Sequence, residues 1–174
     1  MKLIASTTVG AGGASSIEFT SINSTYTDLV LYLSVMSSAS RPWSYIKFNS
    51  VATNYKYVMA IREGGSNYQN YTQTTSGLAT TAITLGVTQQ ANFASNTRIY
   101  IPNYTSTTLA KTAQIRFGAP IDTASGYAGM VAGLSTETGA LSSINITPST
   151  CTYSQYTSAY LYGIAKGSGG ATIS

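Results

Sequence analysis

Hydrophobic and polar positions alternate with a period of two along most of the chain. The strongest run, residues 28–36 (DLVLYLSVM), is apolar at nearly every position and predicts a central strand covered on both faces. Residues 45–49 (YIKFN) alternate cleanly, with Ile46 and Phe48 on one face. Further strands are expected at residues 16–22, 57–62, 82–87, 98–102, 111–117, 129–134, 141–146 and 158–164. No long helical period appears, so the pattern predicts an all-β protein.

Turn-forming residues separate these runs at intervals of roughly 8–12 residues, which is typical of a sandwich or a barrel. We expect eight to ten short strands in an antiparallel two-sheet sandwich of jelly-roll type. Without an internal repeat or a shift in composition, residues 1–174 are expected to form a single domain. Residues 1–16 are expected to be an extended arm or a loose first strand, residues 64–77 a long exposed loop, and residues 165–174 a flexible tail.

The composition indicates an unusual surface. Only 8% of the residues are charged, against about 25% in typical soluble proteins. The polar surface is therefore supplied mostly by 26 Thr and 24 Ser, together with 14 Tyr. Partnered hydroxyls are cheaper to bury than ions, and interface cores favour Tyr over Lys and Glu. This favours a protein that buries much of its outside against neighbours; the alternative is a soluble extracellular domain with an uncharged polar coat.

Charge and cysteine content narrow the set of partners. The net charge is +4, but the nine basic residues are dispersed, so no direct contact with nucleic acid is expected, whereas an acidic partner surface is compatible. Cys151 is the only cysteine, which excludes an intramolecular disulfide and leaves an incidental thiol as the default interpretation. No apolar segment is long enough for a membrane span or a signal peptide, so we expect synthesis in a cytoplasm and no membrane partner.

The residues that enzymes use most are missing or scattered. The chain has no histidine, which removes the commonest general base and metal ligand. Two of the five acids would have to converge in the fold to give a glycosidase pair, the one enzymatic alternative left open. Asp28 is instead expected to cap the turn before its strand, and Glu18 to pair with a basic residue across strands. We therefore expect no catalytic residue, no cofactor and no metal site. The glycines of residues 9–13 are interpreted as a hinge, not as a dinucleotide motif.

Four aromatic residues are candidates for an interface or a ligand site. Trp43 follows Arg41-Pro42 in an expected loop and Tyr45 comes two residues later, while Tyr68 and Tyr71 lie in the expected loop 64–77. Exposed Trp and Tyr on the loops of a sandwich anchor protein interfaces or stack on sugars. The third interpretation is that Trp43 folds back as a lid on the end of the sandwich.

Several sequence blocks, taken in order, resemble small structural proteins of tailed-bacteriophage virions. The blocks are TVGAGGASSIEFTSI (8–22), YTDL (26–29), IKFN (46–49), YIPNY (100–104) and YLYGI (160–164). The resemblance implies a β-sandwich that decorates a capsid or forms part of a tail or fibre, commonly as a homo-oligomer, with no catalytic residues.

The chain contains no coiled-coil heptads and no collagen-like repeat, although a fibre normally needs a shaft. We therefore expect a capsid decoration (cement) protein on the outer surface of the head, made in the bacterial host cytoplasm and located in the virion. Its expected partners are the major capsid protein or other virion proteins, and further copies of itself as a dimer or trimer. The alternative is a tail or fibre module that recognises a host surface glycan through Trp43, Tyr68 and Tyr71.

Overall fold

A computed structural model describes residues 1–39, 42–51, 54–64, 69–74, 82–87, 89–90, 93–120 and 125–165; for 69–74, 83–84, 86–87 and 89–90 it describes only the backbone. These residues form strands and turns. The strands are β1 (Lys2–Thr8), β2 (Ile17–Phe19), β3 (Asp28–Ser37), β4 (Trp43–Phe48), β5 (Tyr55–Gly64), β6 (Gln69–Thr74), β7 (Ile83–Val87), β8 (Gln89–Gln90), β9 (Ser95–Ile101), β10 (Lys111–Pro120), β11 (Gly126–Ser135), β12 (Ile144–Pro148) and β13 (Ser158–Ile164).

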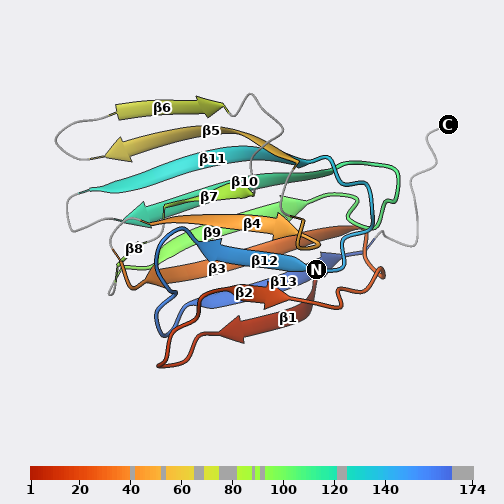
Figure 1. Ribbon diagram of the computed structural model, residues 1–174, viewed down its shortest axis with the longest axis horizontal. Coiled ribbons are helices and arrows are strands. Elements are labelled where there is room, and N and C mark those ends of the chain that lie inside the picture. Colours follow the sequence, from red (N-terminus) through yellow and green to blue (C-terminus); the bar gives the residue numbers. More distant parts are fainter. Residues whose placement is uncertain are drawn as a thin grey trace.

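The strands make two sheets that pack face to face (Figure 1). The large sheet has the order β1-β13-β3-β9-β10-β11-β5-β6, and the small sheet has the order β2-β12-β4-β7. Neighbouring strands along both orders are antiparallel, whereas the short β8 pairs with β3 in parallel. The predicted all-β, two-sheet sandwich is therefore confirmed. In the view of Figure 1, the small sheet lies in front of the large one.

The core lies between the sheets and is filled by alternate residues of each strand. In β3 the inward positions include Leu29, Leu31 and Leu33, each at most 4% exposed. On the small sheet, Ile46 and Phe48 of β4 are equally buried, on the face that the alternation predicted. Because a strand has a side-chain period of two, this register leaves the other positions of the large sheet pointing away from the core.

The prediction that residues 28–36 are covered on both faces is wrong. β3 is central in its sheet, but Tyr32 is 37% exposed on the side away from the small sheet. Val30 is apolar on that same side because its neighbours across the ladder are Tyr162 and Tyr100, whose large side chains surround it. The apolar run therefore does not require a second layer on the outward face, because Val30 is covered by the neighbouring tyrosines of the same sheet.

One segment differs from the expected loop, and another forms the first strand expected as the alternative to an arm. Residues 69–74, expected in a loop, form β6, which pairs along its length with β5. An edge strand is held by main-chain hydrogen bonds and needs no apolar alternation, so the sequence pattern does not reveal it. Residues 2–8 form the edge strand β1, paired with β13. The expected flexible tail lies outside the described residues beyond position 165.

The glycine-rich segment after β1 is a fixed turn and not the expected hinge. Gly13 has φ +72° and donates its N–H to the carbonyl oxygen of Gly10 at 3.1 Å. A Cβ on Gly13 would lie 3.0 Å from the carbonyl oxygen of Tyr153. The next residue, Ala14, exchanges two main-chain hydrogen bonds with Tyr153. Glycine is needed here for the left-handed backbone and for the close approach of a second chain segment.

Tyr55 connects the two sheets through its hydroxyl group. It belongs to β5 of the large sheet and is fully buried. The hydroxyl accepts the N–H of Phe48 at 2.8 Å and lies 3.2 Å from the carbonyl oxygens of Phe48 and Val51, to which it donates. Phe48 is the last residue of β4 and Val51 lies in the turn that follows, so the Tyr55 hydroxyl fixes the main chain where it leaves the small sheet.

Two other buried tyrosines hold chain segments in the same way. The hydroxyl of Tyr104 donates to the carbonyl oxygen of Asn23 and accepts the N–H of Tyr26 at 3.3 Å. The hydroxyl of Tyr153 is hydrogen-bonded to that of Ser44 at 3.0 Å. Burial raises the pKa of both phenols, because the charged form would be desolvated. Part of the tyrosine content therefore serves the core and not the surface.

A fully buried lysine ties two connecting segments together. Lys111, at the start of β10, is 1% exposed. Its ammonium donates to the carbonyl oxygens of Ser106 at 2.8 Å, Leu109 at 2.7 Å and Thr138 at 2.9 Å. The three donors of one ammonium are thus matched by three acceptors. Burial lowers the pKa of Lys111, because the charged form is desolvated.

Replacing Gly163 by alanine is expected to lower the free energy of unfolding by about 1–3 kcal/mol, a typical cost of overpacking. Gly163 lies on β13 beneath the ring of Tyr26, and a Cβ there would be 2.2 Å from the Cγ of that ring. Urea unfolding, followed by the fluorescence of Trp43, measures the loss. Gly118→Ala is the matched control, because a Cβ at Gly118 meets nothing within 4 Å. Equal stability of the two variants would contradict the packing argument.

Candidate functional site

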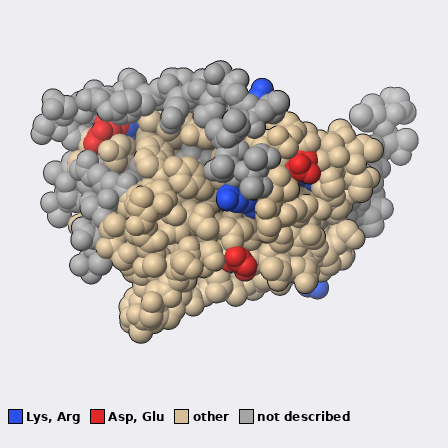
Figure 2. Space-filling model, in the orientation of Figure 1, with Lys and Arg blue, Asp and Glu red and all other residues tan. Residues whose placement is uncertain are grey.

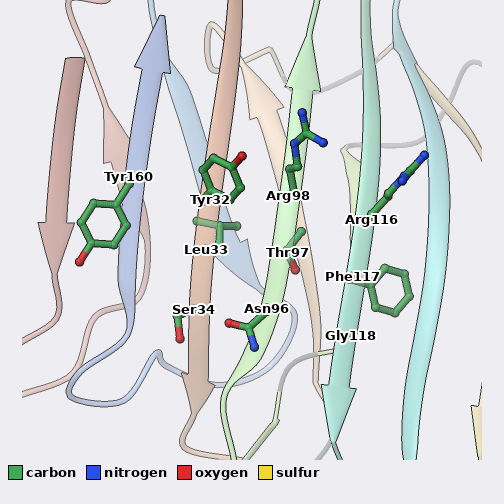
Figure 3. A pocket seen from close by; sticks show the side chains of 10 residues that line it. All are labelled: Tyr32, Leu33, Ser34, Asn96, Thr97, Arg98, Arg116, Phe117, Gly118 and Tyr160. Carbon is green, nitrogen blue, oxygen red and sulfur yellow. The ribbon is translucent and has the colours of Figure 1, made fainter. Parts of the chain in front are cut away.

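The outward face of the large sheet carries one row of large side chains from neighbouring strands. The row is defined by the pairing of Tyr160 with Tyr32, Tyr32 with Arg98, Arg98 with Arg116, and Arg116 with Met130. These five residues come from β13, β3, β9, β10 and β11, and we call them the central row. Tyr160, Tyr32 and Met130 are 40%, 37% and 51% exposed. Figure 3 shows the two tyrosines and the two arginines side by side on this face.

The two arginines of the central row face each other without an internal counter-ion. Arg98 and Arg116 are direct cross-strand partners, a position in which Cβ atoms lie about 4.5–5.5 Å apart. Like charges directly opposite each other destabilise a sheet. Among the described residues, neither guanidinium has a hydrogen-bond or ion-pair partner. The described structure therefore places two cations side by side on the sheet face, with no described partner for either guanidinium.

A shallow groove of about 410 Å³ runs beside these arginines. On the outward face its lining comprises the two tyrosines, the two arginines, Ser34, Asn96 and Gly118 (Figure 3). Ser34, Asn96 and Gly118 are cross-strand partners in the row next to the central row. The space above Gly118 is open, while the serine hydroxyl and the asparagine amide supply neutral donors and acceptors. The groove can therefore accommodate a ligand with both charged and neutral polar groups.

The described acids lie away from the central row. Asp28, at the beginning of β3, accepts the hydroxyl of Tyr100 at 2.8 Å and the main-chain N–H of Asn103 at 2.9 Å. The hydrogen bond to Asp28 raises the pKa of Tyr100. The expected cap on the turn before β3 is therefore wrong: Asp28 caps the turn that follows β9. A carboxylate that points across the sheet finds these donors because β3 and β9 are paired there.

Glu18 also differs from the expectation. It lies on β2 of the small sheet, and its carboxylate accepts the side-chain amide of Asn145 on β12, in place of the expected basic residue. Glu18 and Asn145 are direct cross-strand partners, so the register selects the amide. Asp28 and Glu18 thus lie in different sheets, each with its own hydrogen-bond donors. Figure 2 shows charged side chains at only a few separate places on the small-sheet side of the molecule.

The four aromatic candidates do not form one cluster in the described structure. Trp43 begins β4 and is not in a loop; it is partly buried and packs against the core, as the lid interpretation expected. Tyr45 lies two residues further along β4 and is half-buried. Tyr71 pairs with Ile61 through its main chain in β6, and its side chain is not among the described ones. Tyr68 lies outside the described residues.

Other chemical groups add no second site in the described part of the chain. Cys151 is a free, half-buried thiol. Within the described ranges, no three His, Cys, Asp or Glu side chains are grouped in a way that could hold a metal ion. The same ranges contain no helix with the length and apolar character needed to cross a membrane.

The alternation of polar and apolar residues predicts the outward direction of the two arginines of the central row, although it does not predict that they are neighbours. In residues 98–102 and 111–117, each arginine occupies the polar position of an alternating strand, so its outward direction follows from the pattern. The direct pairing of Arg98 with Arg116 depends on the register between β9 and β10, which no local pattern gives. No protein-family model matches the chain, and no curated protein matches it.

Proposed function

We propose that this protein is a non-enzymatic structural component of a bacteriophage virion, a decoration protein that binds the outer surface of the head. The observation that carries the proposal is the face of the large sheet that the described residues leave exposed, with the central row at its middle. Tyr, Met and Arg are the residue types enriched at protein interfaces, and the central row consists entirely of them.

The composition and the sequence resemblance support the same proposal. With 8% charged residues, the surface loses little hydration energy on contact with a neighbouring protein. The resemblance to small virion proteins covers blocks that lie in β2, β3, β4, β9 and β13, and thus in both sheets. The glycan alternative needs its aromatic residues close together, but Trp43 lies in the small sheet and position 71 in the large sheet. No described contact therefore favours the alternative, a glycan site on a tail module.

The proposal is tested on particles of a phage that encodes this chain. We expect mass spectrometry of purified virions to detect the chain, and cryo-electron microscopy to place it on the outside of the head. Heads stripped of the protein are expected to bind it again when the purified protein is added. Density confined to the tail would overturn the location on the head, and absence from the virions would overturn the proposal altogether.

A further inference from the structure

We propose that Arg98 and Arg116 form a carboxylate-binding site on which an acidic segment of a partner protein docks. The identity of that partner as a virion protein rests on the proposed function, whereas the carboxylate chemistry rests on the outward face of the large sheet alone.

Electrostatics supports an anionic partner. Two guanidinium groups opposite each other repel, and none of the described acids lies in their row. An anion placed between them removes the repulsion and gains charge-assisted hydrogen bonds. A guanidinium presents a planar fork of donors that matches a carboxylate in a bidentate manner, so two adjacent forks fit two neighbouring carboxylates or one carboxylate shared between them.

The surroundings of the arginines favour a protein over a nucleic acid. The other members of the central row are Tyr160, Tyr32 and Met130. The next row contributes Gln114, Ala132 and Val58, which are neutral and in part apolar. A nucleic acid backbone requires cations repeated along a track, because each phosphate carries a charge. Arg62 and Lys56, the other basic residues at outward positions of the described large sheet, lie on β5, two strands from β10. Arg98 and Arg116 are thus a local pair bordered by aromatic and apolar side chains, which corresponds to an interface core with a local charge pair.

The groove provides room for the main chain of the docked segment. Ser34 and Asn96 offer neutral hydrogen-bond partners on one side of the arginines, and Gly118 leaves the space above β10 open. A peptide lying in this groove would direct its acidic side chains to Arg98 and Arg116 and its main-chain groups to Ser34 and Asn96. The site therefore fits an extended acidic segment better than an isolated ion.

The first experiment uses a hexaglutamate peptide as the probe, with hexaglutamine as the neutral counterpart, in calorimetric or NMR titrations. We expect the purified protein to bind hexaglutamate, and binding to weaken as salt increases. The double variant Arg98→Gln/Arg116→Gln is expected to bind roughly tenfold more weakly or worse. The matched control, Lys2→Gln/Lys47→Gln, removes the same charge from β1 and β4 and is expected to stay within about twofold of the unchanged protein.

The second experiment separates binding from folding. Arg116→Glu places an acid directly opposite Arg98, so it replaces the repulsion by an attraction. We expect this variant to unfold at a higher urea concentration than the unchanged protein and to lose hexaglutamate binding. A structural role for the arginines gives the opposite result, because removing a stabilising residue lowers the urea midpoint.

Three results would overturn the inference. One is equal hexaglutamate binding by the double arginine variant and the lysine control. Another is tighter binding of a single-stranded DNA oligonucleotide, an acidic sugar or inorganic phosphate than of hexaglutamate at the same arginines. The third is normal reattachment of the double arginine variant to stripped heads. Absence of the chain from virions, with peptide binding intact, would instead overturn only the proposed function.

Discussion

Lys111→Met is expected to lower the free energy of unfolding by about 3–5 kcal/mol, the usual range when a buried charged group is removed from its partners. Methionine fills a similar volume but donates no hydrogen bond. The carbonyl oxygens of Ser106, Leu109 and Thr138 would then lose their shared donor. These carbonyls belong to two connecting segments, so hydrogen exchange is expected to accelerate at residues 103–110 and 136–140.

Urea unfolding of Lys111→Met, measured by Trp43 fluorescence, is compared with that of Lys56→Met. Lys56 lies on β5 and is only half-buried, so its replacement is expected to change stability by less than about 0.5 kcal/mol. If both variants unfold at the same urea concentration, the ammonium of Lys111 is not needed to hold the two segments.

Alkaline solution is expected to unfold the protein cooperatively. Burial raises the pKa of Tyr55, Tyr104 and Tyr153 above the ordinary value of 10.0 for the unfolded chain. Above pH 10 the unfolded state therefore releases phenolic protons that the folded state retains, and stability falls as pH rises. For a phenol as buried as Tyr153, the loss is about 1.4 kcal/mol for each pH unit above that value.

Lys111 has the opposite effect, but it is one group against several phenols. Its pKa is lowered in the folded state, so between that lowered pKa and 10.5 the unfolded state binds the extra proton and stability rises with pH. Between pH 6 and 8 we expect little change, because the chain contains no histidine. Circular dichroism as a function of pH and urea measures both regions of the profile.

Tyr153→Phe tests the origin of the alkaline transition. This variant keeps the buried ring and has no phenolic proton, so its stability is expected to fall less steeply above pH 10. At neutral pH it is expected to be less stable, because the hydroxyl of Ser44 loses its partner. Tyr156→Phe is the control, since Tyr156 is 69% exposed. A slope that Tyr153→Phe leaves unchanged would contradict the assignment.

Strand positions were predictable where burial is one-sided. The clean alternation in residues 45–49 gave the inward direction of Ile46 and Phe48, and the apolar run at residues 28–36 gave the central strand β3. Edge strands were not predictable in the same way. β6 consists of Gln, Asn, Thr and Tyr residues and depends on main-chain pairing with β5, which is a long-range property.

The functional groups were less predictable than the strands. A lone lysine in a sequence indicates a solvated side chain, and nothing local reveals that Lys111 meets three carbonyl oxygens. As the single tryptophan, Trp43 was a candidate for a ligand or interface site, but in β4 it packs against the core. The candidate site instead depends on how Arg98 and Arg116 meet across β9 and β10.

The pairing of β1 with β13 has a consequence for how the protein forms and how long it lasts. Thr8 lies opposite Ser158, so this edge of the large sheet cannot close until almost the whole described chain has been synthesised. A fold dominated by such distant pairings has a high contact order and crosses a slow folding transition. The same pairing joins the first strand of the chain to the last, so each strand opposes fraying of the other. Where such a contact forms only after the folding transition state, it slows unfolding and not folding. A decoration protein of the kind proposed above would be kept folded outside a cell by such a kinetic barrier.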